Sequence, residues 1–140
     1  MILHRRSLLL GSVASLFVTP ALAAPGFTDY TPGMIQSLLA EGKTVFVDYA
    51  ADWCSTCARQ ERVILSLLSQ NPGYAQNVAF VRVDWDTYRR AEVTTSRSIP
   101  RRSTLIVLKG NQELGRLVAG TSEDDIKALM DTALNAATTS

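Results

Sequence analysis

The sequence predicts an α/β fold in which helices cover both faces of a central mixed sheet. Helical and extended hydrophobic patterns alternate through residues 31–95, which is typical of parallel strands joined by a helical crossover. Two extended runs, 104–109 and 113–119, then follow each other across a Gly-Asn turn and predict an antiparallel hairpin. The expected sheet therefore combines at least one parallel crossover with an antiparallel edge hairpin.

The first helix and the first strand come early in this pattern. A helix is expected over residues 31–42, because Pro32 suits the first helical position and Gly42 suits the end. Residues 44–50 form a mostly apolar, β-branched run that is typical of a buried strand.

From Cys54 the hydrophobic spacing becomes helical, and the helix is expected to end near residues 71–73. Its buried face is expected to contain Ile64, Leu65 and Leu68. The remaining elements are a strand over 78–84, a short helix over 87–95, the hairpin, and a last helix that starts at Ser122, with Asp125 three residues later.

The only two cysteines, Cys54 and Cys57, are three positions apart. A disulfide that serves stability normally joins distant segments, because constraining a longer loop removes more entropy from the unfolded chain. A bridge between these two residues closes almost no loop, so we interpret it as chemical: two thiols that exchange a disulfide reversibly with a partner. A permanent bridge without turnover is the alternative.

The surroundings of the cysteine pair resemble the thioredoxin superfamily. The resemblance is carried by the run from Ala51 through Asp52-Trp53-Cys54 to Cys57, by Glu61, and by the hairpin that begins at Thr104. With these residues the chain resembles exported, periplasmic thioredoxin-like proteins and the periplasmic thioredoxin-like domain of transmembrane disulfide reductases. The resemblance implies a thioredoxin fold over residues 24–140. It also implies a thiol–disulfide oxidoreductase that needs no cofactor and acts on protein thiols and disulfides.

The predicted placement gives the two cysteines different roles. Cys54 at the amino end of a helix is expected to be the nucleophile, because unpaired backbone N–H groups and the helix dipole favour a thiolate. Cys57, one turn further, is expected to resolve the mixed disulfide. Ser55 and Thr56 between them bring hydroxyl groups and replace the Gly-Pro of ordinary thioredoxins.

Two carboxylates and a tryptophan flank the pair. Asp48 lies on an apolar strand where thioredoxins carry a buried acid, and we interpret it as a proton acceptor for Cys57; an acid at a frayed strand end is the alternative. Glu61, one helical turn after Cys57, either disfavours the thiolate or is simply solvated. Trp53 is expected to pack against the site, whereas Trp85 is more typical of a core or rim residue.

One position departs from the family pattern. Thioredoxins carry a cis proline just before the hairpin strand, but an ungapped alignment places Ser103 there and Pro100 three residues earlier. We favour Ser103, because its hydroxyl can hydrogen-bond a thiol or an incoming backbone. The loop over residues 99–103 is expected to face the cysteines. Five arginines precede this loop or belong to it: Arg89, Arg90, Arg97, Arg101 and Arg102. They are expected either to form a positive rim near the cysteines or to be simply solvated.

Residues 1–23 are expected to be a secretory signal peptide. Arg5-Arg6 forms a basic head, residues 8–18 form an apolar run too short to span a membrane comfortably, and Ala21-Leu22-Ala23 predicts cleavage after Ala23. The paired arginines resemble a twin-arginine signal. An ordinary secretory signal and an uncleaved anchor are the alternatives. The expected location is the periplasm.

Cleavage changes the charge and removes the single histidine, His4. The 14 Lys and Arg lose two to leave 12, against 13 Asp and Glu, so the mature chain carries a net charge near −1. This balance argues against a nucleic-acid partner. A mature chain without histidine excludes a Cys-His nucleophile and an imidazole zinc ligand. We expect one monomeric domain and no metal.

Three function classes fit the pattern. Thiol–disulfide exchange is favoured, with a reductase favoured over an oxidase and with a membrane-bound partner as electron donor or acceptor. A soft-metal protein that handles Cu(I) with the same two thiolates is the second class. A noncatalytic peptide-binding module is the third.

Overall fold

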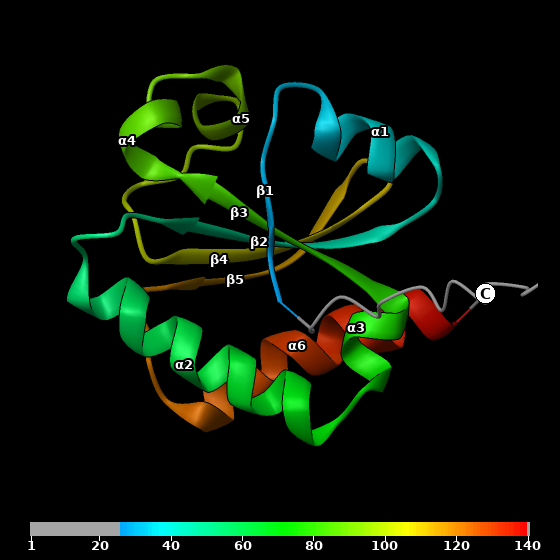
Figure 1. Ribbon diagram of the computed structural model, residues 1–140. Coiled ribbons are helices and arrows are strands. Elements are labelled where there is room, and N and C mark those ends of the chain that lie inside the picture. Colours follow the sequence, from blue (N-terminus) through cyan, green and yellow to red (C-terminus); the bar gives the residue numbers. More distant parts are fainter. Residues whose placement is uncertain (1–25, 140) are drawn as a thin grey trace, which may run out of the picture.

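A five-stranded mixed sheet lies at the centre of the computed structural model, which describes residues 26–139 (Figure 1). The strand order is β1-β3-β2-β4-β5, with β1 and β2 parallel to β3 and with β4 antiparallel to both β2 and β5. The strands are β1 (Thr28–Asp29), β2 (Thr44–Ala50), β3 (Val78–Asp84), β4 (Thr104–Lys109) and β5 (Gln112–Val118). The predicted mixed sheet, with its parallel crossover and edge hairpin, is confirmed.

Helices cover both faces of this sheet (Figure 1). One layer contains α2 (Ser55–Gln70), α3 (Gly73–Asn77) and α6 (Glu123–Thr138); the other contains α1 (Met34–Ala40), α4 (Trp85–Tyr88) and α5 (Glu92–Thr95). Successive residues of a strand face opposite sides. Phe46 therefore belongs to one buried cluster with Ile64 of α2 and Met130 of α6, while Val45 and Val47 belong to the cluster on the α1 side. All seven residues of β2 are buried.

Three helical predictions differ from the structure. The first helix begins at Met34, not at Pro32, because Gly33 adopts a left-handed φ of 87° and ends the preceding turn. The helix expected over 87–95 is two single turns, α4 and α5, and the side chain of Asp84 caps the first by accepting from the Thr87 N–H. In α2, Leu65 is 37% exposed and Leu67 is buried in its place.

Two short elements had no sequence signal. β1 is two residues long and pairs with the middle of β3. α3 is a separate five-residue helix that begins three residues after the end of α2, and it buries Tyr74, whose hydroxyl donates to Asp131 of α6. Neither element is long enough to show a hydrophobic period.

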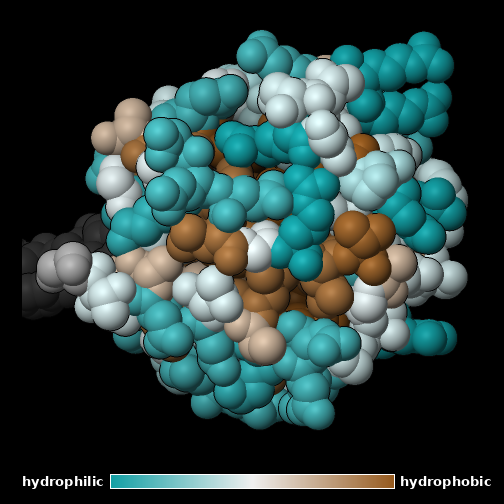
Figure 2. All heavy atoms as spheres, turned by 180° about the vertical axis from the view of Figure 1, so that it is seen from behind, coloured by the Kyte–Doolittle hydropathy of each residue, from teal (hydrophilic) through white to brown (hydrophobic). Residues whose placement is uncertain are grey.

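The hairpin partner β5 forms an edge of the sheet. Its glycine, Gly115, is required by packing, since a Cβ atom there would lie 2.6 Å from Cδ1 of Leu129 on α6. Figure 2 shows apolar side chains in the middle of the face that β5 borders, with hydrophilic ones around them. β5 carries the half-buried Leu114 and Leu117 and the 41% exposed Val118.

The signal peptide expected over residues 1–23, and its cleavage after Ala23, lie outside residues 26–139. In the part of the chain that is described, no helix combines the length and the apolar character that a membrane span needs.

Candidate active site

The two cysteines lie where the carboxyl end of β2 leads into α2. Cys54 is the N-cap residue of α2, with φ −90° and ψ 111°, and its Sγ accepts the N–H of Cys57 at 3.2 Å. Cys57 lies in the first turn, and the two residues form a disulfide with a Cα–Cα distance of 5.3 Å. Cys54 is 4% exposed and Cys57 is 3% exposed. The expected placement at a helix start is therefore observed, with a backbone N–H aimed at Cys54 Sγ.

A small apolar cluster surrounds the disulfide. Ala50 and Ala51 at the end of β2 are buried with the cysteines, and half-buried Trp85 packs against them. Trp85 also packs against the core on the α1 side of the sheet. It thus connects the cysteine cluster to that core, a contact that its place after a strand did not reveal.

Ser103, and not Pro100, contacts the sulfur atoms. Its Oγ lies 3.2 Å from Cys54 Sγ and 3.1 Å from Cys57 Sγ, and the residue is fully buried. Ser103 has a left-handed φ of 62°, and its preceding peptide bond is trans, like every other peptide bond between residues 26 and 139. Pro100 is exposed. A serine with a left-handed backbone conformation thus lies beside the disulfide.

Gln60 is a polar residue of this site that the sequence did not reveal. It is fully buried on α2, one turn after Cys57. Its Nε2 donates to the Ser103 carbonyl at 3.1 Å and to the Gly120 carbonyl at 2.9 Å. The signal available was its spacing: Gln60 follows Cys57 by three residues and precedes buried Ile64 by four.

Asp48 is a buried carboxyl group in the middle of β2, and not at a frayed strand end. It is 1% exposed, and its Oδ1 has no hydrogen-bond partner within the described chain. Burial raises the pKa of Asp48 to about 7; the charge of Arg82 opposes this effect and that of Glu61 adds to it. Asp48 lies between Phe46 and Ala50 on the α2 side of the sheet, because alternate strand residues share a face.

The other predicted site residues lie at the surface. Ser55 is exposed and Thr56 is half-buried. Glu61 is exposed, because Gln60 occupies the inward face of this helical turn. Glu61 is therefore solvated, which was the second of the two expectations for it. Its negative charge still contributes to the raised pKa of Asp48. Trp53, expected to pack against the site, is next to Cys54 in the chain and is 60% exposed.

Trp53 is nevertheless held in one orientation. Its Nε1 donates to Asp86 Oδ2 at 2.8 Å, and the guanidinium carbon of Arg102 lies 4.4 Å from the centre of the indole ring. A guanidinium over an aromatic face is a favourable cation–π contact. Among the five clustered arginines, Arg102 thus lies beside the cysteine loop. Arg89 and Arg90 are exposed in the segment between α4 and α5.

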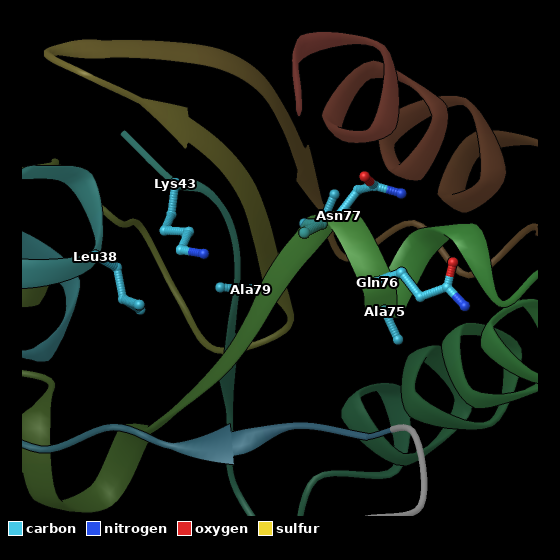
Figure 3. A pocket seen from close by; sticks show the side chains of 7 residues that line it. Leu38, Lys43, Ala75, Gln76, Asn77 and Ala79 are labelled. Carbon is cyan, nitrogen blue, oxygen red and sulfur yellow. The ribbon is translucent and has the colours of Figure 1, made fainter. Parts of the chain in front are cut away.

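A hollow of about 260 Å³ lies at the opposite end of the sheet (Figure 3). It is lined by residues at the amino ends of β2 and β3, by α1 and by α3: Leu38, Lys43, Ala75, Gln76, Asn77, Val78 and Ala79. The cysteines lie at the carboxyl end of β2, which is where sites of open α/β sheets form. This hollow is therefore separate from the redox pair.

Comparison with known proteins agrees with this geometry. The thioredoxin family profile matches residues 31–132. Thioredoxin H2-1 of Oryza sativa subsp. japonica is 31% identical over 90 residues, which are 64% of this chain and 60% of the rice protein. The chain thus matches only about 60% of that relative's length.

Two solved structures are also similar. Trxlp of Edwardsiella tarda EIB202 has a TM-score of 0.62 at 31% identity, covering 72% of this chain and 96% of its own. The reduced thioredoxin pre-protein of Schistosoma mansoni has a TM-score of 0.61 at 25% identity, covering 76% and 96%. Because the family profile extends over most of the chain, from the turn before α1 into α6, this protein belongs to the thioredoxin family.

Proposed function

We propose that this protein is an exported thiol–disulfide oxidoreductase that exchanges the Cys54–Cys57 pair with protein partners. The observation that carries the proposal is the position of Cys54 at the N-cap of α2, where its sulfur accepts a backbone N–H, with Cys57 one turn away. This geometry favours a thiolate on Cys54 and leaves Cys57 close enough to close the disulfide. Membership in the thioredoxin family supports the same chemistry.

In the reductive direction the exchange has two steps. The Cys54 thiolate attacks one sulfur of a partner disulfide, a mixed disulfide forms, and the other partner sulfur leaves as a thiolate. Deprotonated Cys57 then attacks Cys54 Sγ, the internal disulfide forms, and the second partner sulfur leaves. Two electrons pass from the dithiol to the partner, and the two thiol protons end on the partner's sulfurs.

Asp48 is proposed to accept the proton of Cys57. Its carboxyl group is buried on the sheet face that α2 covers, and its raised pKa of about 7 suits proton transfer near neutral pH. Oδ1 has no partner among residues 26–139, so it is free to accept a hydrogen bond from a water molecule that relays the proton.

Export and direction are further parts of the proposal. The basic head, apolar run and Ala-Leu-Ala of the first 23 residues support transport to the periplasm. A reductase there draws electrons from a membrane-bound donor, since the chain itself contributes only the dithiol. A measured reduction potential below that of the compartment supports this direction, and a higher one supports an oxidase.

A copper-handling role is the alternative for the same thiolates. The exchange reaction is the better supported function, because Cys54 lies at the N-cap of α2 and the thioredoxin family profile covers the site. Equilibrium dialysis of the reduced protein against Cu(I) distinguishes the two, because a carrier must retain copper against a competing chelator.

Trapping of mixed disulfides tests the exchange reaction. Cys57→Ser should accumulate partners bound through Cys54, because the resolving thiol is missing, and Cys54→Ser should accumulate none. Nonreducing gels of both variants, with the double variant as the control, show the difference. Equal trapping by both single variants would overturn the assigned roles, and binding that persists in Cys54→Ala would favour a noncatalytic module.

A further inference from the structure

Ser103 lies within hydrogen-bond distance of both sulfur atoms of the redox pair. We propose that its hydroxyl is a catalytic hydrogen-bond donor to whichever cysteine sulfur carries the negative charge, and that Gln60 is the residue that positions it. This inference rests on the disulfide exchange proposed above and adds a residue that adjusts its redox equilibrium.

The backbone of Ser103 is held in an unfavourable conformation. Its φ of 62° lies in the left-handed region, which is unfavourable for a residue with a Cβ atom. Such a conformation persists only where the surrounding structure fixes it, and it is concentrated at functional sites. The contacts of Ser103 should therefore include groups that fix this backbone.

Three elements supply those groups. The Ser103 N–H donates to the Tyr49 carbonyl of β2 at 2.8 Å. Its carbonyl accepts the N–H of Ala119, just after β5, at 2.8 Å and Nε2 of Gln60, on α2, at 3.1 Å. Both backbone groups of Ser103 are thus occupied. The hydroxyl is the polar group of this residue that faces the sulfurs.

Gln60 connects this backbone to the helix that carries the cysteines. Its Nε2 also donates to the Gly120 carbonyl at 2.9 Å, so one buried amide fixes both the start of β4 and the loop after β5. Because Cys57 and Gln60 lie on the same helix one turn apart, Gln60 also fixes the distance between that helix and Ser103.

The hydroxyl should act differently in the two redox states. A thiolate is charged and accepts a stronger hydrogen bond than the neutral sulfur of a disulfide. The hydroxyl therefore stabilises the reduced pair relative to the oxidised pair. In the first step it donates to the Cys54 thiolate, and in the second it donates to Cys57 as that sulfur loses its proton. When the internal disulfide is reduced, it stabilises Cys57 as the leaving thiolate.

Two variants separate the hydroxyl from the backbone conformation. Ser103→Ala removes the hydroxyl and keeps a Cβ atom in the left-handed region, while Ser103→Gly removes the hydroxyl and relieves the strain. In both, the equilibrium with glutathione should shift about tenfold towards the protein disulfide, which is about 30 mV for a two-electron couple. Alkylation of Cys54 by iodoacetamide at pH 6 should slow by a similar factor in both variants.

A double-mutant cycle tests the positioning role of Gln60. Gln60→Met keeps the volume and removes both N–H donors, and it should shift the glutathione equilibrium about threefold in the same direction. In the Ser103→Ala background the same substitution should leave the equilibrium unchanged, because no hydroxyl remains to position. If Gln60→Met lowers the melting temperature but keeps the wild-type glutathione equilibrium, Gln60 has only a structural role. That result would overturn this part of the proposal.

Failure of this inference differs from failure of the proposed function. If Ser103→Ala and Ser103→Gly keep the wild-type glutathione equilibrium and alkylation rate while Cys54→Ser abolishes exchange, the function stands and the role of Ser103 is wrong. If the wild-type protein exchanges no disulfide at all, the proposed function fails first. Should Ser103→Ala not fold, the unstrained Ser103→Gly decides the role of the hydroxyl alone.

Discussion

Asp48 on β2 lies directly opposite Arg82 on β3, and the guanidinium group of Arg82 hydrogen-bonds Asp52 at 2.8 Å. Asp52 is 96% exposed, so Arg82 is drawn towards the surface while Asp48 stays buried. Burial accordingly raises the pKa of Asp48 to about 7, although the nearby charge of Arg82 favours the ionised form. The raised pKa of Asp48 is therefore expected to make the stability of the protein depend on pH.

Asp48→Asn should make the protein more stable at alkaline pH. The pKa of Asp48 rises from 3.8 to about 7 on folding. The stabilisation that such an acid contributes is therefore complete at a pH below 3.8, and it is lost as the pH rises through about 7. The variant should match the wild type most closely at pH 4 and gain on the order of 4 kcal/mol relative to it by pH 8. Urea unfolding of the oxidised proteins measures this difference.

Asp52→Asn is the matched control, because it removes an exposed carboxylate that pairs with the same arginine. It should change the free energy of unfolding by less than about 1 kcal/mol at either pH. A difference between Asp48→Asn and wild type that is the same at pH 4 and pH 8 would contradict the raised pKa of Asp48.

Asp48→Asn should also slow the release of the mixed disulfide. The amide cannot accept the proton of Cys57, so the rate near pH 7 should fall roughly a hundredfold while the fold stays intact. Stopped-flow measurements from pH 6 to 9 should show a wild-type rate that rises through about pH 7 and a variant that lacks this rise. Unchanged kinetics across this range would make Asp48 structural only.

The mature protein should begin at Ala24. The Ala21-Leu22-Ala23 run provides small residues at the cleavage site of the expected signal peptide. Intact-mass measurement of periplasmic protein gives the first residue directly. Replacing Arg5 and Arg6 with lysines should abolish export if the signal is of the twin-arginine type, and should leave it intact for an ordinary secretory signal. A mass that retains residues 1–23 would contradict cleavage.

Ala119→Gly should stabilise the protein. Ala119 has a left-handed φ of 59°, which glycine adopts without a steric cost, so the free energy of unfolding should rise by about 1 kcal/mol. Ala128→Gly is the control with the opposite sign, because Ala128 is exposed inside α6 and glycine should cost about 1 kcal/mol there. Chemical denaturation of both variants compares them; destabilisation by both would contradict the strain at Ala119.

Strands with long hydrophobic runs were predictable to the residue. Residues 44–50, 78–84 and 104–109 coincide with β2, β3 and β4, because a buried strand needs a continuous apolar run and polar or turn residues bound it. The start of α6 was equally clear, since the Ser122 side chain accepts the N–H of Asp125, as the capping pattern predicts. β1 and α3 are too short to leave such a pattern.

The candidate site was only partly predictable. The spacing of Cys54 and Cys57 and the apolar surroundings of Asp48 are local features, so the sequence identified all three. Gln60 was missed although its spacing from Cys57 and Ile64 places it on the buried face, because a polar helical residue beside Arg59 and Glu61 is ordinarily solvated. It is buried because carbonyl groups of Ser103 and Gly120, distant in the chain, accept its two donors.

The sequence by itself determined the long strands β2 to β5, the redox pair and the α/β class, because these depend on hydrophobic periods and on residues only three positions apart. The sequence also placed Ser103 in a loop that faces the cysteines, and the antiparallel pairing of β4 with β2 brings it there. The tertiary structure decided that its backbone is left-handed and that hydrogen bonds with three other segments fix it. Contacts between segments 40 to 60 residues apart depend on strand pairing and helix packing, which no local pattern specifies.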